Sequence, residues 1–267
     1  MREIIDRVQI NMPFQLLAER YLPIILEKKI NPEIGFNCFV LDRFKKDEFK
    51  DIADRITDAG LTVTMHAPFF DLRPGAVDPK LRAASIERLK QFFDLAPLFR
   101  PRSMVCHAAF EEKYYINIEK DWLTNSVDTW SHFIDIAADL DSIIALENVY
   151  EESPLYPALL LDAFSDVQQI GYCFDTGHCN TFSSAPMEEW IDKIGLRIKE
   201  VHLHDNDGSS DAHDAIGDGT FPFHDFLNIL SERGIRPIIT LEPHTEKTLW
   251  RTLEKIKEMK LLKYLDD

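Results

Sequence analysis

The chain has 267 residues, 45% of them hydrophobic and 28% charged, which is typical of one large globular domain and excludes overall disorder. The formal net charge of -16 and the pI near 5.0 disfavour polyanionic partners, and no lysine- and arginine-rich run offers a surface for DNA. No apolar run approaches the roughly 18 residues that span a membrane, so we expect no membrane contact and no signal peptide at the charged N-terminus.

Short apolar runs rich in β-branched residues recur along the chain, and longer stretches with helical periodicity separate them. Apolar residues return every three or four positions in residues 14–29, 47–60, 78–99 and 246–262, for example. The pattern predicts eight strands, at residues 8–12, 34–39, 61–66, 103–107, 143–149, 170–175, 198–205 and 237–242.

Alternation of strand and helix over the whole chain predicts a (β/α)8 TIM barrel, with residues 1–267 as a single domain. The structural alternative is a doubly wound open sheet. That fold usually has a glycine-rich turn after its first strand, and residues 11–15 contain no glycine.

The four cysteines are far apart in sequence and have no CxxC spacing. Cys38, Cys106 and Cys173 fall in apolar, strand-like runs, and Cys179 follows His178 in a polar turn. We interpret them as reduced thiols of a cytoplasmic protein.

Metal-binding side chains gather where the predicted strands end. In a TIM barrel these positions and the loops that follow them form the active face. Reading them in order gives nine candidate metal ligands: His66, His107, Glu147, Asp175, His178, His202, Asp211, His213 and Glu242.

Glu147 in ALENV and Glu242 in ITLEP are the least ordinary of these residues. A buried carboxylate without a partner costs several kcal/mol. Few basic residues lie near these strands, so a divalent metal ion is the simplest partner. Imidazole and carboxylate together favour zinc, with manganese and iron as alternatives.

The motifs that surround these residues are MHAPFFDL, VCHAAF, ALENVY, GYCFDTGH, VHLHDNDGSSDAHDAIGDG and LEP. In them the chain resembles the xylose isomerase-like TIM barrel superfamily, which includes family 2 AP endonucleases such as endonuclease IV. The resemblance extends from the third strand onward and is weak in the first sixty residues.

Resemblance to endonuclease IV implies a site for two or three metal ions. It places His66, His107 and Glu147 at one ion, with Glu147 bridging to a second ion. The remaining residues divide into Asp175, His202 and Glu242 at the second ion, and His178, Asp211 and His213 at the third. It also implies metal-assisted hydrolysis of a phosphoester, with Glu147, Glu242 and His178 as candidate catalytic residues, and this was our leading prediction.

The isomerase and epimerase branch of the superfamily implies a different use of the same face. There a quartet that matches Glu147, Asp175, His202 and Glu242 holds one metal, and the two glutamates serve as acid and base on a sugar. The endonuclease-like first-strand motif is absent and acid replaces a lysine in residues 204–207, so a sugar or sugar phosphate is a realistic substrate and DNA a disfavoured one. A metal-storing barrel without activity is the third alternative.

Other conspicuous side chains of the same loops are candidates for substrate contact. Phe69 and Phe70 could stack on a sugar or a base, although core packing is the plainer interpretation. Arg73 could meet a phosphate. His204, Asp205 and His244 complete the set of predicted substrate-binding residues.

Overall fold

A computed structural model describes residues 1–264, and the last three residues of the predicted domain, 265–267, lie outside the described part. Eight parallel strands close into a barrel in sequential order, and β8 pairs with β1. The strands are β1 (Gln9–Pro13), β2 (Asn31–Gly35), β3 (Thr64–His66), β4 (Ser103–His107), β5 (Ile143–Glu147), β6 (Ile170–Asp175), β7 (Ile198–Leu203) and β8 (Ile238–Leu241). The predicted TIM barrel is confirmed.

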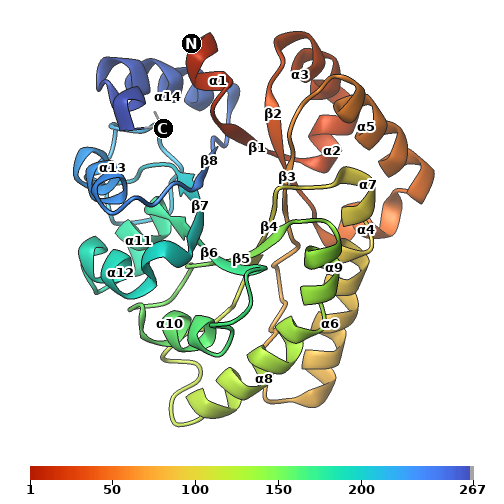
Figure 1. Cartoon of the computed structure of the whole chain (residues 1–267), viewed down its shortest axis with the longest axis vertical. Helices are drawn as coiled ribbons and strands as arrows, with labels where there is room; N and C mark the ends of the chain where they lie inside the picture. Colours follow the sequence, from red (N-terminus) through yellow and green to blue (C-terminus); the bar gives the residue numbers. More distant parts are fainter. Residues whose placement is uncertain (265–267) are drawn as a thin grey trace.

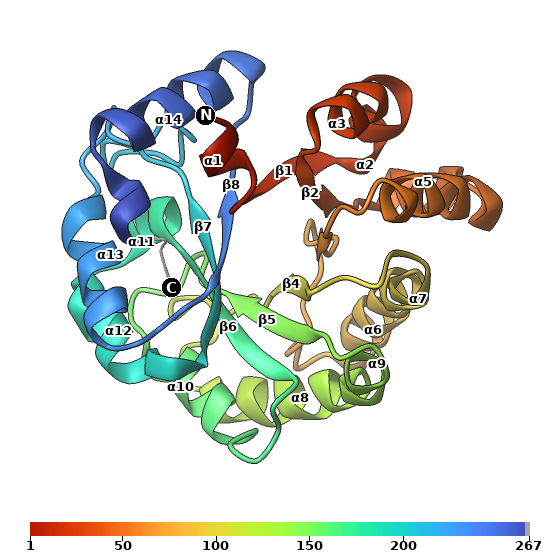
Figure 2. The ribbon, with the colours of Figure 1, turned by 45° about the horizontal axis from the view of Figure 1, so that its top comes forward.

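Helices surround the barrel on its outside, as Figures 1 and 2 show. They are α1 (Arg2–Ile5), α2 (Phe14–Leu16), α3 (Leu22–Lys28), α4 (Cys38–Arg43), α5 (Lys46–Asp58), α6 (Pro79–Phe93), α7 (Ala96–Phe99), α8 (Glu119–Ser131), α9 (Ile134–Asp139), α10 (Leu155–Asp162), α11 (Thr176–Phe182), α12 (Met187–Ile194), α13 (Phe223–Glu232) and α14 (Glu246–Glu258). Within residues 1–264, no helix is both long enough and apolar enough to cross a membrane.

The helices form because one face of each is apolar. In α5, the buried side chains are Phe49, Ile52, Ala53 and Ile56, a spacing that places them on one stripe facing the barrel. The large core between helices and strands contains Phe14, Phe92, Trp122, Trp130 and Trp190, all fully buried. This outer layer holds the barrel closed and fixes where its strands end.

The interior of the barrel is divided into an apolar half and a polar half. Val105, Ala145 and Cys173 form a small separate core inside β4, β5 and β6. On the opposite side, the buried interior residues include Glu33, Thr64, Glu200 and Thr240. TIM barrels usually fill this space with branched apolar residues, so the polar half calls for an explanation.

Two predicted strands, β4 and β6, have the predicted bounds, and others differ at their ends. The largest error concerns β2, which begins at Asn31 and ends at Gly35. The predicted strand at residues 34–39 was wrong because the Asn37 side chain accepts a hydrogen bond from Val40 N at 2.9 Å and caps α4. Cys38 therefore opens a helix instead of lying in a strand.

All four cysteines are unpaired in the structure. Cys179 lies buried in α11 and not in an exposed turn. The cytoplasmic location stays a prediction.

Candidate metal centre

Strand alternation points the candidate ligands of β3 to β7 into the mouth of the barrel. Residues two apart on a strand share a face, so His202 lies on the same face as Glu200, and His66 on the same face as Thr64. Parallel register then places the strand ends side by side: His107 pairs with Glu147, and Asp175 pairs with His202. The strand ends thus bring together the residues that sequence analysis selected from separate segments.

The two oxygens of Glu147 face different groups of imidazoles. Oε2 lies 3.3 Å from His66 Nε2 and 2.9 Å from His107 Nε2. Oε1 lies 2.8 Å from His202 Nδ1 and 3.8 Å from His178 Nδ1. A carboxylate placed in this way can bridge two metal ions.

His202 is the centre of a second group, which we call the inner quartet: Glu147, Asp175, His202 and Glu242. Its Nδ1 atom lies 2.8 Å from Glu147 Oε1, 3.2 Å from Glu242 Oε1 and 3.8 Å from Asp175 Oδ2. The histidine is fully buried, as are Glu147 and Asp175, whereas the Glu242 side chain is 10% exposed. The inner quartet therefore lies at the bottom of the mouth, with Glu242 on its open side.

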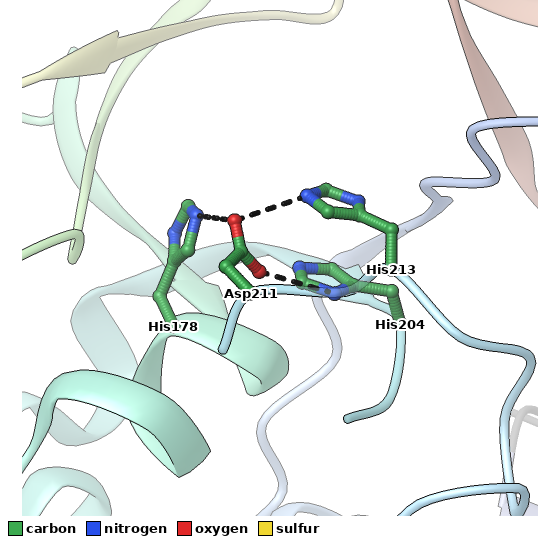
Figure 3. Close-up of side chains that lie close together, drawn as sticks. All are labelled: His178, His204, Asp211 and His213. Carbon is green, nitrogen blue, oxygen red and sulfur yellow. Dashed lines mark hydrogen bonds and ion pairs between the residues drawn. The ribbon is translucent and has the colours of Figure 1, made fainter. Parts of the chain in front are cut away.

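A third group lies farther out, and we call it the outer cluster: His178, His204, Asp211 and His213 (Figure 3). Asp211 Oδ2 lies 3.3 Å from His178 Nε2 and 3.2 Å from His213 Nε2, and its Oδ1 lies 3.7 Å from His204 Nδ1. The backbone of His213 is in the left-handed region, with φ of 49°. Such strain in a residue other than glycine is a common mark of functional sites.

The GYCFDTGH motif explains how β6 delivers two of these ligands. Asp175 ends β6 and caps α11, because its Oδ1 accepts a hydrogen bond from His178 N at 2.6 Å. This cap turns the chain back so that His178 faces the barrel mouth. Gly177 permits the close approach of His204 to this turn, because a Cβ at residue 177 would overlap the His204 ring.

Buried polar atoms of the inner quartet and the outer cluster show whether these side chains fit a metal ion. Glu147 Oε1, His202 Nδ1, His202 Nε2, His204 Nδ1 and Asp211 Oδ1 are buried and have no hydrogen-bond partner within the described chain. Glu147 Oε1 nevertheless lies 2.8 Å from His202 Nδ1, and Asp211 Oδ1 lies 3.7 Å from His204 Nδ1. Such distances are found between ligands around a common cation. The residues therefore fit a divalent metal centre.

The buried carboxylates and imidazoles of this centre shift one another's pKa values. Burial alone would raise the pKa of Glu147, but His202 and His107 beside it hold that pKa well below its usual range. Burial would lower the pKa of His213, but the hydrogen bond to Asp211 raises it to about 9. Protons and a metal ion therefore compete for the same nitrogens.

The aromatic and basic residues predicted to contact substrate lie at the rim. The ring of Phe69 stacks on His107 at 4.5 Å, and Phe70 beside it is 74% exposed. Arg73 lies over the Tyr114 ring at 4.9 Å and 3.9 Å from a carboxylate oxygen of Glu111. The arginine is thus already engaged by neighbours in its own region of the rim.

The three remaining residues predicted to contact substrate have different positions. His204 is fully part of the outer cluster, stacked on His213 at 3.7 Å with its Nε2 3.0 Å from Asp175 Oδ2. His244 is exposed and stacks on the other side of His213 at 3.8 Å. Asp205 corrects the prediction, because it is fully buried and its carboxylate accepts hydrogen bonds from loop amides instead of facing the mouth.

Sequence analysis missed three buried polar residues around the centre. Asn148 exchanges two hydrogen bonds of 2.9 Å with the backbone of Asp175, and its carbonyl oxygen lies 2.9 Å from His178 Nδ1. Glu33 and Glu200 lie fully buried inside the barrel. Glu200 lies inside a predicted strand, so the argument used for Glu147, a carboxylate inside a strand, could have selected it. The wrong bounds of the second strand left Glu33 out.

Glu151, in the loop after β5, makes stability near the centre depend on pH. Burial raises its pKa to about 7 from 4.5. The folded state therefore holds a proton that the unfolded state releases from about pH 4.5, so stability falls as pH rises towards 7 and stays lower above it.

We expect Glu151→Gln to be more stable than wild type at pH 8 by about 1–3 kcal/mol, and no more stable at pH 4.5. Urea unfolding at both pH values measures this. Glu152→Gln, a half-buried neighbour paired with Lys113, should show no such dependence, and an equal gain in both variants would contradict the assignment.

Comparison with known proteins places the fold in a family. The model of the family described as xylose isomerase-like TIM barrel matches residues 32–264. An uncharacterized protein of Methanocaldococcus jannaschii is 30% identical over 202 residues, which are 73% of this chain and 69% of that protein. Fructoselysine 3-epimerase of Escherichia coli is 32% identical over 57 residues, which are 21% of each chain.

A solved structure extends the similarity over nearly the whole chain. A D-tagatose 3-epimerase-like protein superposes with a TM-score of 0.76 at 25% identity, covering 96% of this chain and 98% of that one. A fructoselysine 3-epimerase is thus among the sequence relatives, and a D-tagatose 3-epimerase-like protein is among the structural neighbours. The chain belongs to the xylose isomerase-like TIM barrel family.

Proposed function

We propose that the protein is a divalent-metal-dependent isomerase or epimerase of an unphosphorylated sugar. The observation that carries the proposal is the inner quartet, in which Glu147 of β5 and Glu242 after β8 approach the same nitrogen of His202 at 2.8 and 3.2 Å. Two carboxylates that approach one point can remove a proton from a substrate carbon held between them and return a proton to it. The sugar epimerases among the relatives support this activity better than phosphoester hydrolysis.

The chemistry requires a proton to leave and return at a carbon next to a carbonyl. One glutamate removes this proton as general base, and the other delivers a proton as general acid. Glu147, Asp175, His202 and Glu242 would hold the metal, for which zinc, manganese and iron are the candidates. When bound, the metal would supply polarisation of the sugar oxygens, which makes the neighbouring C–H bond more acidic.

The loops around the mouth argue against a phosphorylated substrate. Between each described strand and the helix that follows it, the lysine and arginine side chains are Arg73 and Lys113, and each is paired with an acidic neighbour. TIM barrels usually bind phosphate with the loops after the seventh and eighth strands. Here those loops contain Asp205, Asp207, Asp211, Asp214, Asp218 and Glu242 without any lysine or arginine.

The aromatic rim offers a surface for a neutral sugar instead. Phe69 stacks on the candidate ligand His107, and Phe70 lies next to it with ring centres 4.4 Å apart. Aromatic faces pack on the C–H faces of sugar rings without any charge on the substrate. The substrate class that fits the charge and the rim is therefore an uncharged ketose or keto sugar.

The outer cluster supports phosphoester hydrolysis as a second candidate function. It contributes His178, Asp211 and His213, which complete the set that endonuclease IV resemblance implies, and Asp211 Oδ1 has no hydrogen-bond partner among residues 1–264. Under that function three metal ions would bind, and the outer cluster would be essential. Under sugar isomerisation, the outer cluster is dispensable for proton transfer.

The test is solvent deuterium exchange on a panel of free ketoses with the metal-loaded protein. We expect deuterium to enter the carbon next to the carbonyl, an epimer or aldose to form, and chelation to abolish both. The matched variant Asp211→Ala should retain exchange. Cleavage of abasic DNA or of a sugar phosphate, lost in Asp211→Ala and without any deuterium exchange in wild type, would overturn the proposal in favour of the second candidate.

A further inference from the structure

Glu33 is a fully buried carboxylate in the middle of β2, directly beside the inner quartet. Asn11 Nδ2 donates a hydrogen bond to its Oε1 at 2.8 Å, and Thr64 Oγ1 donates to its Oε2 at 3.1 Å. Its third neighbour is His202, whose Nε2 lies 3.3 Å from Oε1. In residues 1–264 no lysine or arginine forms an ion pair with it.

Burial of such a carboxylate is costly, so its position needs a reason. A carboxylate taken out of water costs several kcal/mol unless its partners compensate for the loss. Below their ends, β4, β5 and β6 fill the barrel interior with the uncharged residues Val105, Ala145 and Cys173. Glu33, in the polar half of the interior, contacts His202. His202 in turn contacts each of the three carboxylates of the inner quartet.

The two ring nitrogens of His202 have separate environments. Nδ1 faces Glu147, Asp175 and Glu242, whereas Nε2 faces Glu33. A histidine ligand generally has its second nitrogen fixed by a carboxylate, a carbonyl or water, which sets the tautomer and the ring orientation. The negative charge of Glu33 beside Nε2 favours the tautomer with its hydrogen on that nitrogen, although the 3.3 Å contact lacks hydrogen-bond geometry. That tautomer leaves the lone pair of Nδ1 for a metal ion.

We propose that Glu33 is a positioning residue that holds His202 so that Nδ1, and not Nε2, is the metal-binding atom. The inference rests on the proposed function only in requiring a divalent metal at the inner quartet. Direct ligation by Glu33 is the rival, since Glu33, His202 and Glu242 could together hold an ion. Each Glu33 oxygen, however, already accepts a hydrogen bond from Asn11 or Thr64, which favours positioning.

The experiment compares Glu33→Gln with a matched interior variant, Glu200→Gln. Glu200 is also fully buried in the barrel, but its oxygens accept hydrogen bonds from Ser103 and Thr240. Within residues 1–264, the carboxylate that forms an ion pair with His202 Nε2 is that of Glu33 and not that of Glu200. Zinc and manganese affinities are measured by competition with a chelating dye, and the unfolding of the metal-free proteins is measured in urea. Neither readout needs a substrate.

We expect Glu33→Gln to bind metal about 10- to 100-fold more weakly, which is the usual effect of removing such a partner. Cooperative urea unfolding of its metal-free form should show that the variant still folds, so that weaker metal binding is not caused by loss of the fold. Glu200→Gln should keep wild-type metal affinity to within about twofold. Thr64→Val removes one hydrogen-bond donor to Glu33 and should also weaken metal binding. If Glu33→Gln does not fold, the metal affinity of Thr64→Val tests the inference in its place.

Three outcomes would overturn the inference. Wild-type metal affinity in Glu33→Gln, or in Thr64→Val if Glu33→Gln does not fold, would make Glu33 purely structural. Equal weakening in Glu200→Gln would attribute the effect to interior charge in general. Loss of one oxygen ligand from the X-ray absorption spectrum of loaded Glu33→Gln would identify Glu33 as a direct ligand. Absence of metal binding by wild type would instead contradict the proposed function.

Discussion

Glu242→Gln should lower kcat for deuterium exchange and sugar epimerisation by about 10²- to 10⁴-fold, the usual contribution of a positioned acid or base. Glutamine retains an oxygen that can face the metal but cannot accept or deliver the proton. Glu242 lies on the open side of the inner quartet, where its side chain is 10% exposed and can reach a bound substrate. Steady-state kinetics with the best ketose of the panel, together with metal content per chain, measure the effect.

A nearby surface glutamate provides the control. Glu246 begins α14, four residues after Glu242, and pairs with Arg20 on the surface. Glu246→Gln should keep kcat within about twofold. Full activity of metal-loaded Glu242→Gln would remove Glu242 from the proton transfer, and loss of bound metal in that variant would show that its main role is ligation.

The fold was predictable because apolar strand-like runs alternate with segments of helical periodicity along the whole chain. Strands that are apolar on both faces alternate with amphipathic helices, and this pattern alone led to the closed barrel. The bounds of β4 and β6 were also predictable, since His107 and Asp175 end clear apolar runs. The second strand was not, because Asn37 starts a helix inside an equally apolar run through a side-chain cap.

The convergence of the candidate ligands was predictable for a topological reason. Every strand of a parallel barrel ends at the same face, so polar residues at successive strand ends must meet there. The interior beneath that face was not predictable, because whether a strand residue points into the barrel depends on register. A shift of a few residues in β2 hid Glu33, and no sequence pattern showed that the Asp205 carboxylate faces its own loop.

The loop from β7 to α13 depends on Asp205. Its Oδ1 accepts hydrogen bonds from Asn206 N at 2.9 Å and Phe221 N at 3.1 Å, and its Oδ2 from Gly217 N at 2.9 Å and Gly219 N at 3.0 Å. Its backbone also pairs with Asp214 in an antiparallel bridge. A single buried carboxylate thus closes the loop that carries the two outer-cluster residues Asp211 and His213.

Asp205→Ala should therefore lower the free energy of unfolding by about 3–5 kcal/mol, because four backbone amides lose their acceptor and each unsatisfied buried donor costs about 1–3 kcal/mol before water relieves it. Urea unfolding of the metal-free protein measures the loss. Asp207 is an exposed neighbour whose carboxylate accepts hydrogen bonds from Ser209, and Asp207→Ala should change stability by less than about 0.5 kcal/mol. The same loop positions Asp211 and His213, so Asp205→Ala should also displace these two residues of the outer cluster. The inner quartet is built from strand ends and the residue after β8, so metal affinity there should stay at the wild-type level. An Asp205→Ala protein as stable as wild type would mean that water replaces the carboxylate and that the loop closes through other contacts.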